Sequence, residues 1–227
     1  MTSNDMAETL RSLWPSSAPE LIVISWGVSD AALRQHDHTA ARRTVERTTT
    51  ADHNSTVVLA PRGVGGVYRH HLVLEAFRQA RRTRLDLHLL VIDTRRTDAT
   101  EYEPSDSDGV TILPMQPRSE LHTLLAGVDG VVSIPAADQR STSVLEAIAL
   151  GARVLLSDIP AYRELLVEGA DVDILGEPVL ESLTLAFRSI QPTTLAAREA
   201  NQQWARAHER ESIQFDRIVT ACTRDAR

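Results

Sequence analysis

Two carboxylates, Asp138 and Glu146, stand at the two ends of a serine-rich turn. The apolar run at residues 130–134 predicts a buried strand before this turn, and a helical pattern begins near residue 143. A turn that leads from a strand into a helix presents free backbone N–H groups and the positive end of the helix dipole. The stretch is therefore a candidate site for a phosphate or another anion.

The same stretch also has a purely structural interpretation. Ser143 and Glu146 have the spacing of a capping box, in which the hydroxyl and the carboxylate satisfy the first free N–H groups of a helix. Gly151 stands where a C-terminal cap of that helix is expected. Spacing alone leaves these two interpretations of Glu146 evenly balanced.

A second turn of this kind follows the apolar run at residues 56–60. Residues 61–66 read Pro-Arg-Gly-Val-Gly-Gly, and the three glycines allow a ligand to approach the backbone closely. Arg62 in this turn is a good bidentate partner for a phosphate. Taken alone, a turn of this composition is more typical of an ordinary loop.

The composition excludes several classes of chemistry. All 24 basic residues are arginines, so this chain itself supplies no Schiff-base lysine, Walker-A lysine or lysine general base. The formal net charge of −7 argues against a general binder of nucleic acids or membrane surfaces. Cys222 is the single cysteine, which leaves no internal disulfide framework, and we expect it to be a buried helix residue.

No metal site and no membrane insertion are predicted. The two histidine pairs, His36 with His38 and His70 with His71, lack carboxylate or cysteine partners at helical spacing. No apolar run approaches the roughly 18 residues of a membrane span. The first residues lack the basic and apolar regions of a signal peptide, so we expect a cytoplasmic location.

Short apolar runs alternate with helical patterns along the chain. This alternation predicts a doubly wound α/β domain with a parallel, Rossmann-like sheet. We expect a helical extension over residues 1–20, the Rossmann-like domain over 21–192 and a C-terminal helical segment over 193–227. Residues 35–55 contain few large apolar side chains and are expected to form a surface linker or loop. Strands are expected at 21–25, 56–60, 87–92, 110–113, 130–134, 153–157 and 172–175.

Taken in order, these motifs resemble the C-terminal, donor-binding half of a family 4 glycosyltransferase of the GT-B fold. Residues 138–146 resemble its E-x7-E motif, with aspartate in place of the first glutamate. Residues 145–164 resemble the family's "LEAMACG-x-PV-x-x-SD-x-P…RE". Residues 110–117 resemble the segment whose backbone faces the nucleobase, and 21–28 resemble the strand and turn that open this half.

The resemblance implies a nucleoside-diphosphate sugar as donor substrate, with no cofactor. Glu146 would bind the ribose hydroxyls, Asp138 would lie beside the donor sugar, and Arg62 would hold the leaving diphosphate. Asp138 and Arg62 are thus the expected catalytic residues. Transfer would retain the anomeric configuration through positioning and electrostatic stabilisation. The other expected donor-binding residues are Ser141, Thr142, Ser143, Gly63, Met115 and Arg69.

The sequence departs from the family at two further points. Val67 stands where the family has a lysine, and Arg69 is expected to supply the missing charge. The acceptor-binding domain of a GT-B enzyme has no counterpart here. Three hypotheses stay open: a split enzyme whose acceptor half is a separate protein, a nucleotide-sugar-binding module without turnover, and a piece of a longer enzyme. The first is favoured; pairing of two copies stays open, and Trp204 and Phe215 are expected in the core or at a partner interface.

Overall fold

In the computed structural model, residues 3–14, 20–34, 36–62, 66–93 and 108–224 are described. Six strands form one parallel sheet: β1 (Thr56–Ala60), β2 (Leu87–Asp93), β3 (Val110–Pro114), β4 (Gly130–Ser133), β5 (Arg153–Ser157) and β6 (Val172–Leu175). Their order in the sheet is β3-β2-β1-β4-β5-β6, as in a doubly wound Rossmann fold. The predicted α/β fold class is therefore confirmed.

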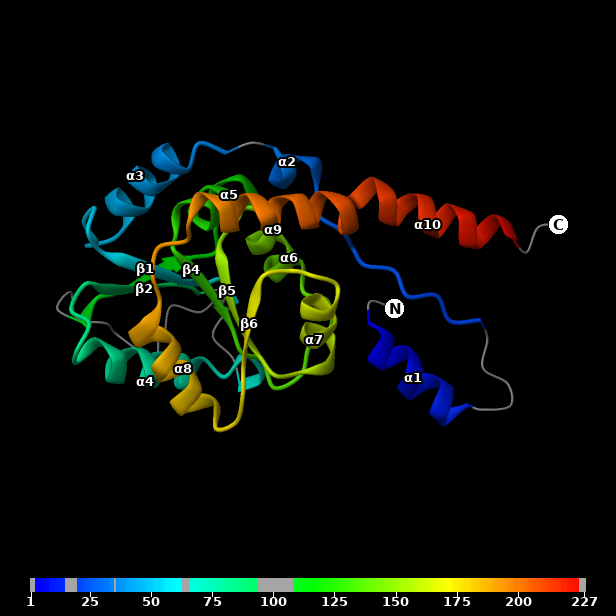
Figure 1. The fold of residues 1–227 in the computed structure, drawn as a ribbon, viewed down its shortest axis with the longest axis horizontal. Helices are drawn as coiled ribbons and strands as arrows, with labels where there is room; N and C mark the ends of the chain where they lie inside the picture. Colours follow the sequence, from blue (N-terminus) through cyan, green and yellow to red (C-terminus); the bar gives the residue numbers. More distant parts are fainter. Residues whose placement is uncertain (1–2, 15–19, 35, 63–65, 94–107, 225–227) are drawn as a thin grey trace.

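Helices cover both faces of this sheet (Figure 1). Helices α4 (His70–Arg81) and α8 (Val179–Ser189) pack side by side on one face. The other face carries α3 (His38–Thr48), α5 (Arg118–Gly127), α6 (Thr142–Ala149) and α9 (Leu195–His208). The remaining helices are α1 (Asn4–Leu13), α2 (Asp30–Leu33), α7 (Pro160–Val167) and α10 (Glu211–Arg224).

The strands are apolar on both sides because each face of the sheet is covered. In β1, Val57 and Leu59 belong to the core under α3, α5 and α6, while Val58 and Ala60 belong to the core under α4 and α8. This division follows from the alternation of side chains along a strand. It also explains why residues 57–60 of β1 are an uninterrupted apolar run in the sequence.

The prediction for residues 35–55 is wrong, because α3 occupies most of them. Only two residues of α3, Ala41 and Val45, are buried, so its apolar pattern is weak. A Cβ at Gly127 would lie 2.5 Å from the Ala41 carbonyl oxygen, which shows how closely α3 approaches α5. Arg42 further fixes α3 through an ion pair with Asp129 at 2.8 Å.

The strand expected at residues 21–25 is also wrong. These residues lie outside the sheet, and Val28 alone forms an isolated parallel bridge, with Arg210. The Val28 N–H donates to the Glu209 carbonyl, and the Glu211 N–H donates to the Val28 carbonyl. The apolar run therefore reflects packing near the end of the chain rather than a place in the sheet.

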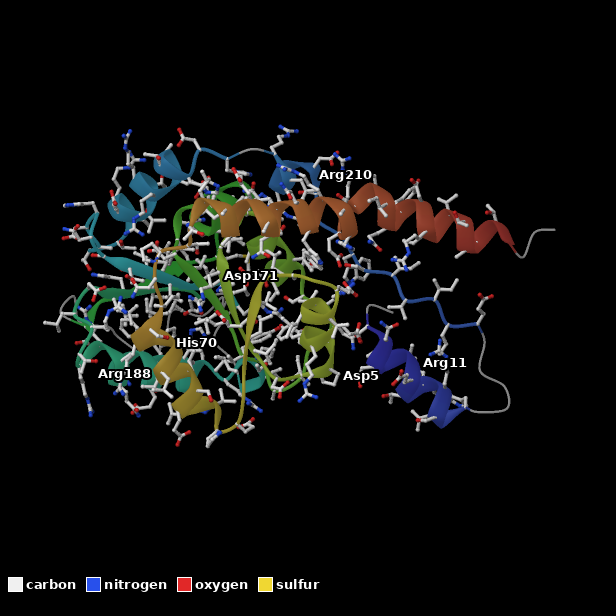
Figure 2. The ribbon with its side chains drawn as sticks, in the orientation of Figure 1. Asp5, Arg11, His70, Asp171, Arg188 and Arg210 are labelled. Atoms are coloured by element: carbon white, nitrogen blue, oxygen red, sulfur yellow. The ribbon has the colours of Figure 1, made fainter. Side chains whose placement is uncertain are left out.

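The C-terminal segment contains two helices, α9 and α10, that meet at Glu209 and Arg210 (Figure 2). Arg198 anchors α9, since its buried guanidinium donates to the carbonyls of Val128 and Gly151. Trp204 lies in the core, as expected, whereas Cys222 on α10 is exposed and not buried. Among the described helices, none is both long enough and apolar enough to cross a membrane. The division into three segments stays a prediction.

Candidate functional site

The strand order places a topological switch point between β1 and β4. These strands are neighbours, yet the chain continues from them toward opposite edges of the sheet. Ligands in such folds bind outside the carboxyl ends of the strands at this switch point. Arg62 lies two residues beyond β1, and Asp138 lies in the loop that follows β4. The fold thus brings together two residues that are 76 positions apart in sequence.

Arg62 lies at the centre of a group of polar side chains at this switch point, which we call the Arg62 cluster. Its other members are Tyr68, Asp138, Ser141 and Tyr162. Its Nη1 donates to Asp138 Oδ2 at 2.9 Å and to the Ser141 hydroxyl, and its Nη2 donates to the Tyr68 hydroxyl at 2.8 Å. The guanidinium also lies 4.4 Å from the centre of the Tyr68 ring, a cation–π distance. Burial lowers the pKa of Arg62, but Tyr68 and the charge of Asp138 outweigh it, so the net pKa is raised.

The Asp138 carboxylate is held by three donors. Besides Arg62, the Tyr162 hydroxyl donates to Oδ2 at 2.9 Å and the Gln139 N–H donates to Oδ1 at 2.8 Å. Burial, together with the charge of Asp138, raises the pKa of Tyr162, so the phenol stays protonated and can donate. Asp138 is therefore an acceptor in a fixed orientation.

Ser141 is the N-cap of α6, and no side-chain hydrogen bond caps this helix. The Ser141 hydroxyl instead contacts Arg62 and, at 3.0 Å, the Ser143 hydroxyl. The capping-box interpretation of Ser143 and Glu146 is therefore wrong. Gly151 does follow the helix with a positive φ of 78°, as the C-terminal cap prediction required.

Glu146 faces α5 and is only 3% exposed. Its Oε1 accepts from Arg118 Nε at 2.7 Å and contacts His122 Nε2 at 3.0 Å. Burial raises the pKa of Glu146, but the bonds from His122 and Arg118 outweigh this effect and the net pKa is lowered. Glu146 is therefore an ionised carboxylate whose described hydrogen bonds all use one oxygen.

The other expected donor-binding residues are less tightly connected to this cluster. Thr142 is the first residue of α6. Met115 is exposed beyond β3. Arg69 pairs with Glu177 at 3.6 Å, and Gly63 lies outside the described residues. The roles expected for these four residues stay predictions.

Sequence reasoning missed four polar residues of the site: Tyr68, Arg118, His122 and Tyr162. Arg118 and His122 have the i, i+4 spacing of neighbours on one helix face, which is a signal that could have been found. Tyr162 comes two residues after Pro160, the first residue of α7. Its approach to Asp138 depends on the path of α7 and has no signal in the sequence.

Two of the four histidines for which no metal site was predicted make hydrogen bonds to backbone carbonyls. His36 contacts the Ala31 carbonyl and His38 contacts the Ala126 carbonyl. Within the described part of the chain, no group of three or more His, Cys, Asp or Glu residues gathers at metal-binding distance.

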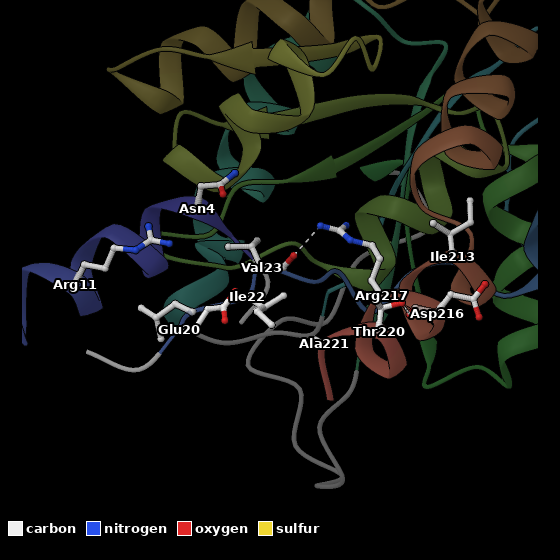
Figure 3. Close-up of a pocket in the computed structure, with 11 residues that line it drawn as sticks. Asn4, Arg11, Glu20, Ile22, Val23, Ile213, Asp216, Arg217, Thr220 and Ala221 are labelled. Carbon is white, nitrogen blue, oxygen red and sulfur yellow. Dashed lines mark hydrogen bonds between the residues drawn. The ribbon is translucent and has the colours of Figure 1, made fainter. Parts of the chain in front are cut away.

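A separate pocket lies between α1, residues 20–23 and α10 (Figure 3). Arg217 extends toward residues 20–23 and donates to the Val23 carbonyl at 3.0 Å. None of its lining residues belongs to the Arg62 cluster or contacts Glu146. The lining residues are Asn4, Arg11, Glu20, Leu21, Ile22, Val23, Ile213, Asp216, Arg217, Thr220 and Ala221.

No protein-family model matches the sequence, and no curated protein does either. Among solved structures, the chain is similar to WaaG, described as a glycosyltransferase involved in lipopolysaccharide biosynthesis (TM-score 0.75, 16% identity, 95% of this chain and 60% of WaaG). It is also similar to a glycosyltransferase from Rickettsia africae (TM-score 0.78, 15% identity, 98% and 62%). A third similar structure is Anabaena HepE in complex with UDP and glucose (TM-score 0.73, 14% identity, 98% and 62%).

These similarities show that the chain has the Rossmann-like fold of GT-B glycosyltransferases. The chain spans about 60% of the length of these neighbours. Correspondence to their C-terminal half stays a prediction.

Proposed function

We propose that this chain is the donor-binding subunit of a retaining glycosyltransferase that uses a nucleoside-diphosphate sugar. The observation that carries the proposal is the convergence of Arg62, Asp138 and Ser141 at the switch point of the sheet, beside the N-terminus of α6. An arginine, a hydroxyl and a helix N-terminus are together suited to a diphosphate. The neighbours described with UDP or its sugars make UDP-glucose the first donor to test.

The contacts of Arg62 suggest how a diphosphate would be accommodated. Asp138 and Ser141 now share Nη1, so a phosphate oxygen would compete with them for this donor. Asp138 would keep its place when Arg62 turns, because Tyr162 and the Gln139 N–H still hold it. The arginine charge would then be available to stabilise the leaving diphosphate, the group on which negative charge develops.

The contacts of Asp138 also favour transfer without a covalent enzyme intermediate. Both oxygens already accept hydrogen bonds, one from the Gln139 N–H and the other from Arg62 and Tyr162. A carboxylate that accepts hydrogen bonds on both oxygens is a weaker nucleophile, since these bonds stabilise its charge. Positioning of the substrates and electrostatic stabilisation of the leaving group would then contribute most to catalysis. The resemblance to family 4 glycosyltransferases implies the same two contributions for transfer with retention of configuration.

Glu146 is suited to recognise the ribose. It is ionised and nearly buried, and Arg118 and His122 fix Oε1. Its Oε2 has no hydrogen-bond donor among the described residues and could accept from a sugar hydroxyl. A charged acceptor makes a hydrogen bond of about 1.5–3 kcal/mol.

A separate acceptor-binding protein is the partner we propose. Several apolar side chains are exposed around the junction of residues 20–28 with α10, including Trp26, which is 72% exposed. Large exposed apolar patches mark interaction sites in soluble proteins. Phe215 is exposed, which agrees with the partner-interface alternative for this residue. The exposed apolar residues of this region are Ile22, Trp26, Ile213, Phe215, Ile218 and Val219.

The alternative function is a nucleotide-sugar-binding module without turnover. Val67, at the position of the family's lysine, is exposed, and Arg69 pairs with Glu177 rather than with the Arg62 cluster. Only one arginine of this loop therefore contacts the described cluster. Assay of UDP release from UDP-glucose, with the chain alone and with a co-purified partner and acceptor, separates the two functions. Turnover with the partner supports a transferase; donor binding without turnover supports the module.

The proposal is tested by measuring nucleotide binding to the purified chain. UDP, GDP, dTDP and ADP are titrated by calorimetry against wild type, Arg62→Met and Arg153→Met. Arg153 is a matched control, because it lies at the opposite end of the sheet and pairs with Asp173. We expect one nucleotide to bind wild type and Arg153→Met alike and to bind Arg62→Met at least about tenfold more weakly. If none of the four nucleotides binds the wild-type chain, the proposal is contradicted.

A further inference from the structure

Arg140 lies between the two site residues Asp138 and Ser141, but its side chain contacts a different region. It forms ion pairs with Glu168, the C-cap residue of α7, and with Glu209 at 3.0 Å from Nη1 to Oε1. The Arg140 side chain is largely buried, and the Glu209 side chain is 0% exposed. The backbone of the proposed donor site is thus attached to a buried acidic residue that is distant in sequence.

Glu209 belongs to a tightly built junction. It follows α9, its carbonyl accepts from the Val28 N–H, and the Glu211 N–H returns to the Val28 carbonyl. Gly27 has a φ of 74°, and a Cβ on it would lie 2.7 Å from the Glu211 Cα. The junction therefore holds the start of α10 against residues 27–28 with almost no free space.

A buried carboxylate needs a cation nearby, and Arg140 supplies it. An unpaired buried charge costs several kcal/mol, so removal of one partner of a buried pair is expensive. Burial raises the pKa of Glu209, and the charge of Arg140 opposes that rise. The pair is therefore an electrostatic link between the donor loop and the junction, through a 3.0 Å Nη1–Oε1 contact that lacks hydrogen-bond geometry.

The preceding residue of the loop, Gln139, has a second link to a terminal segment. The hydroxyl of Ser3, which caps α1, donates to Gln139 Oε1 at 3.2 Å. The N-terminus of α1 is itself held by Glu164 of α7, which accepts from the N–H groups of Asn4 and Asp5. Both residues between Asp138 and Ser141 therefore contact segments outside the sheet.

We infer that Arg140 is a positioning residue that fixes the Asp138–Ser141 loop to the α9–α10 junction and thereby sets the affinity of the site for a nucleoside diphosphate. This inference rests on the proposed function. Arg140 does not touch the Arg62 cluster in any described contact; it acts through the backbone of its two neighbours. The junction also borders the exposed apolar residues at which we place the partner, so the same link joins the partner surface to the donor site.

The test compares two arginines, Arg140 and Arg42, that both form partly buried ion pairs but lie in different parts of the fold. Arg140→Met and Arg42→Met each remove a guanidinium from a partly buried ion pair and keep an apolar stem. Arg42 pairs with Asp129, which precedes β4 at the opposite end of the sheet. For each purified full-length variant, thermal unfolding is recorded without ligand, and UDP binding is measured by calorimetry; the nucleotide found to bind wild type replaces UDP if it differs.

Both variants are expected to unfold at a lower temperature. Arg140→Met should bind UDP about tenfold more weakly, whereas Arg42→Met should stay within about twofold of wild type, as expected for a distant site. Glu209→Gln, which keeps the shape of the side chain, should weaken UDP binding in the same direction as Arg140→Met. The double variant Arg140→Met, Glu209→Gln should bind no more weakly than the worse single variant, because both changes break one link.

Two outcomes would overturn the inference, and they differ from failure of the proposed function. Unchanged affinity in both Arg140→Met and Glu209→Gln, with binding by wild type, shows that the ion pair only stabilises the fold. Equal weakening by Arg42→Met shows a general loss of stability rather than positioning. If wild type binds no nucleotide, the proposed function fails and this inference fails with it.

Discussion

The two carboxylates at the ends of residues 138–146 differ in how they are held. Asp138 accepts hydrogen bonds on both oxygens, from Arg62, Tyr162 and the Gln139 N–H. Among the described residues, Glu146 accepts from Arg118 and His122, and on Oε1 alone. The first carboxylate is thus engaged on both oxygens, while the second keeps one oxygen for a further donor.

Asp138 and Glu146 belong to one sequence motif, but this difference in hydrogen bonding suits them to different roles. Asp138 orients Arg62, the arginine that we propose binds a diphosphate, and is itself oriented by Tyr162 of α7. Glu146 is a charged acceptor suited to a ribose. Substitutions in the two regions should therefore affect different parts of a nucleotide, and pyrophosphate, which lacks the ribose, is a probe that tells them apart.

The largest effect is expected from Arg62→Met, through loss of the diphosphate contact. Binding of both UDP and pyrophosphate should weaken by about 10- to 100-fold, from the loss of charge-assisted hydrogen bonds of about 1.5–3 kcal/mol. Calorimetric titration of both ligands measures this change. Loss of UDP binding with intact pyrophosphate binding would show that Arg62 does not hold the diphosphate.

A smaller and more selective effect is expected from Glu146→Gln. UDP should bind about tenfold more weakly, since a neutral amide is a weaker acceptor than a carboxylate. Pyrophosphate should bind as in wild type. The measurement is the ratio of the dissociation constants for UDP and pyrophosphate. An equal change in both constants would contradict different roles for Asp138 and Glu146.

Tyr162→Phe should lower stability more than it lowers affinity. It removes one donor to Asp138, a bond whose net contribution is about 1 kcal/mol, while Arg62 and Gln139 still hold the carboxylate. Urea unfolding with and without UDP measures both quantities. A tenfold loss of UDP affinity corresponds to about 1.4 kcal/mol of binding free energy. A loss of that size or larger would indicate that Tyr162 contacts the ligand.

The smallest effect is the pH dependence that Glu146 confers on stability. Its folded pKa lies below the usual value of 4.5, so the ionised form stabilises the fold above pH 4.5, and this contribution is lost as the pH falls through the folded pKa. The difference in unfolding free energy between wild type and Glu146→Gln should therefore be constant near neutral pH and shrink below 4.5. A constant difference down to about pH 3 would contradict the lowered pKa.

The sheet was predictable because its signals are local. Strands β1, β4 and β5 are short runs of mostly buried apolar residues, and each is followed by a helical pattern. Helix α3 was not predictable from its pattern, since it buries small side chains such as Ala41 against Gly127. That contact depends on the backbone of α5, which a sequence pattern does not contain.

The site was predictable where a motif ends at a strand or helix terminus. Arg62, Asp138 and Ser141 lie in turns that were predicted to follow strands, and parallel strands bring their carboxyl ends to one edge of the sheet. Tyr162 reaches Asp138 from α7, and Arg118 reaches Glu146 from α5. These contacts are set by the packing of helices over the sheet, so sequence spacing alone did not reveal them.

The exposed Trp26 gives the chain a built-in optical reporter. Its indole lies in water beside the α9–α10 junction, whereas Trp204 is buried against His208. A protein that covers the junction should shift the fluorescence emission of Trp26 to shorter wavelength, while unfolding should shift that of Trp204 to longer wavelength. Once Trp14, the third tryptophan, which is 54% exposed, is replaced by phenylalanine, one spectrum can distinguish docking of a partner from loss of the fold, without a label.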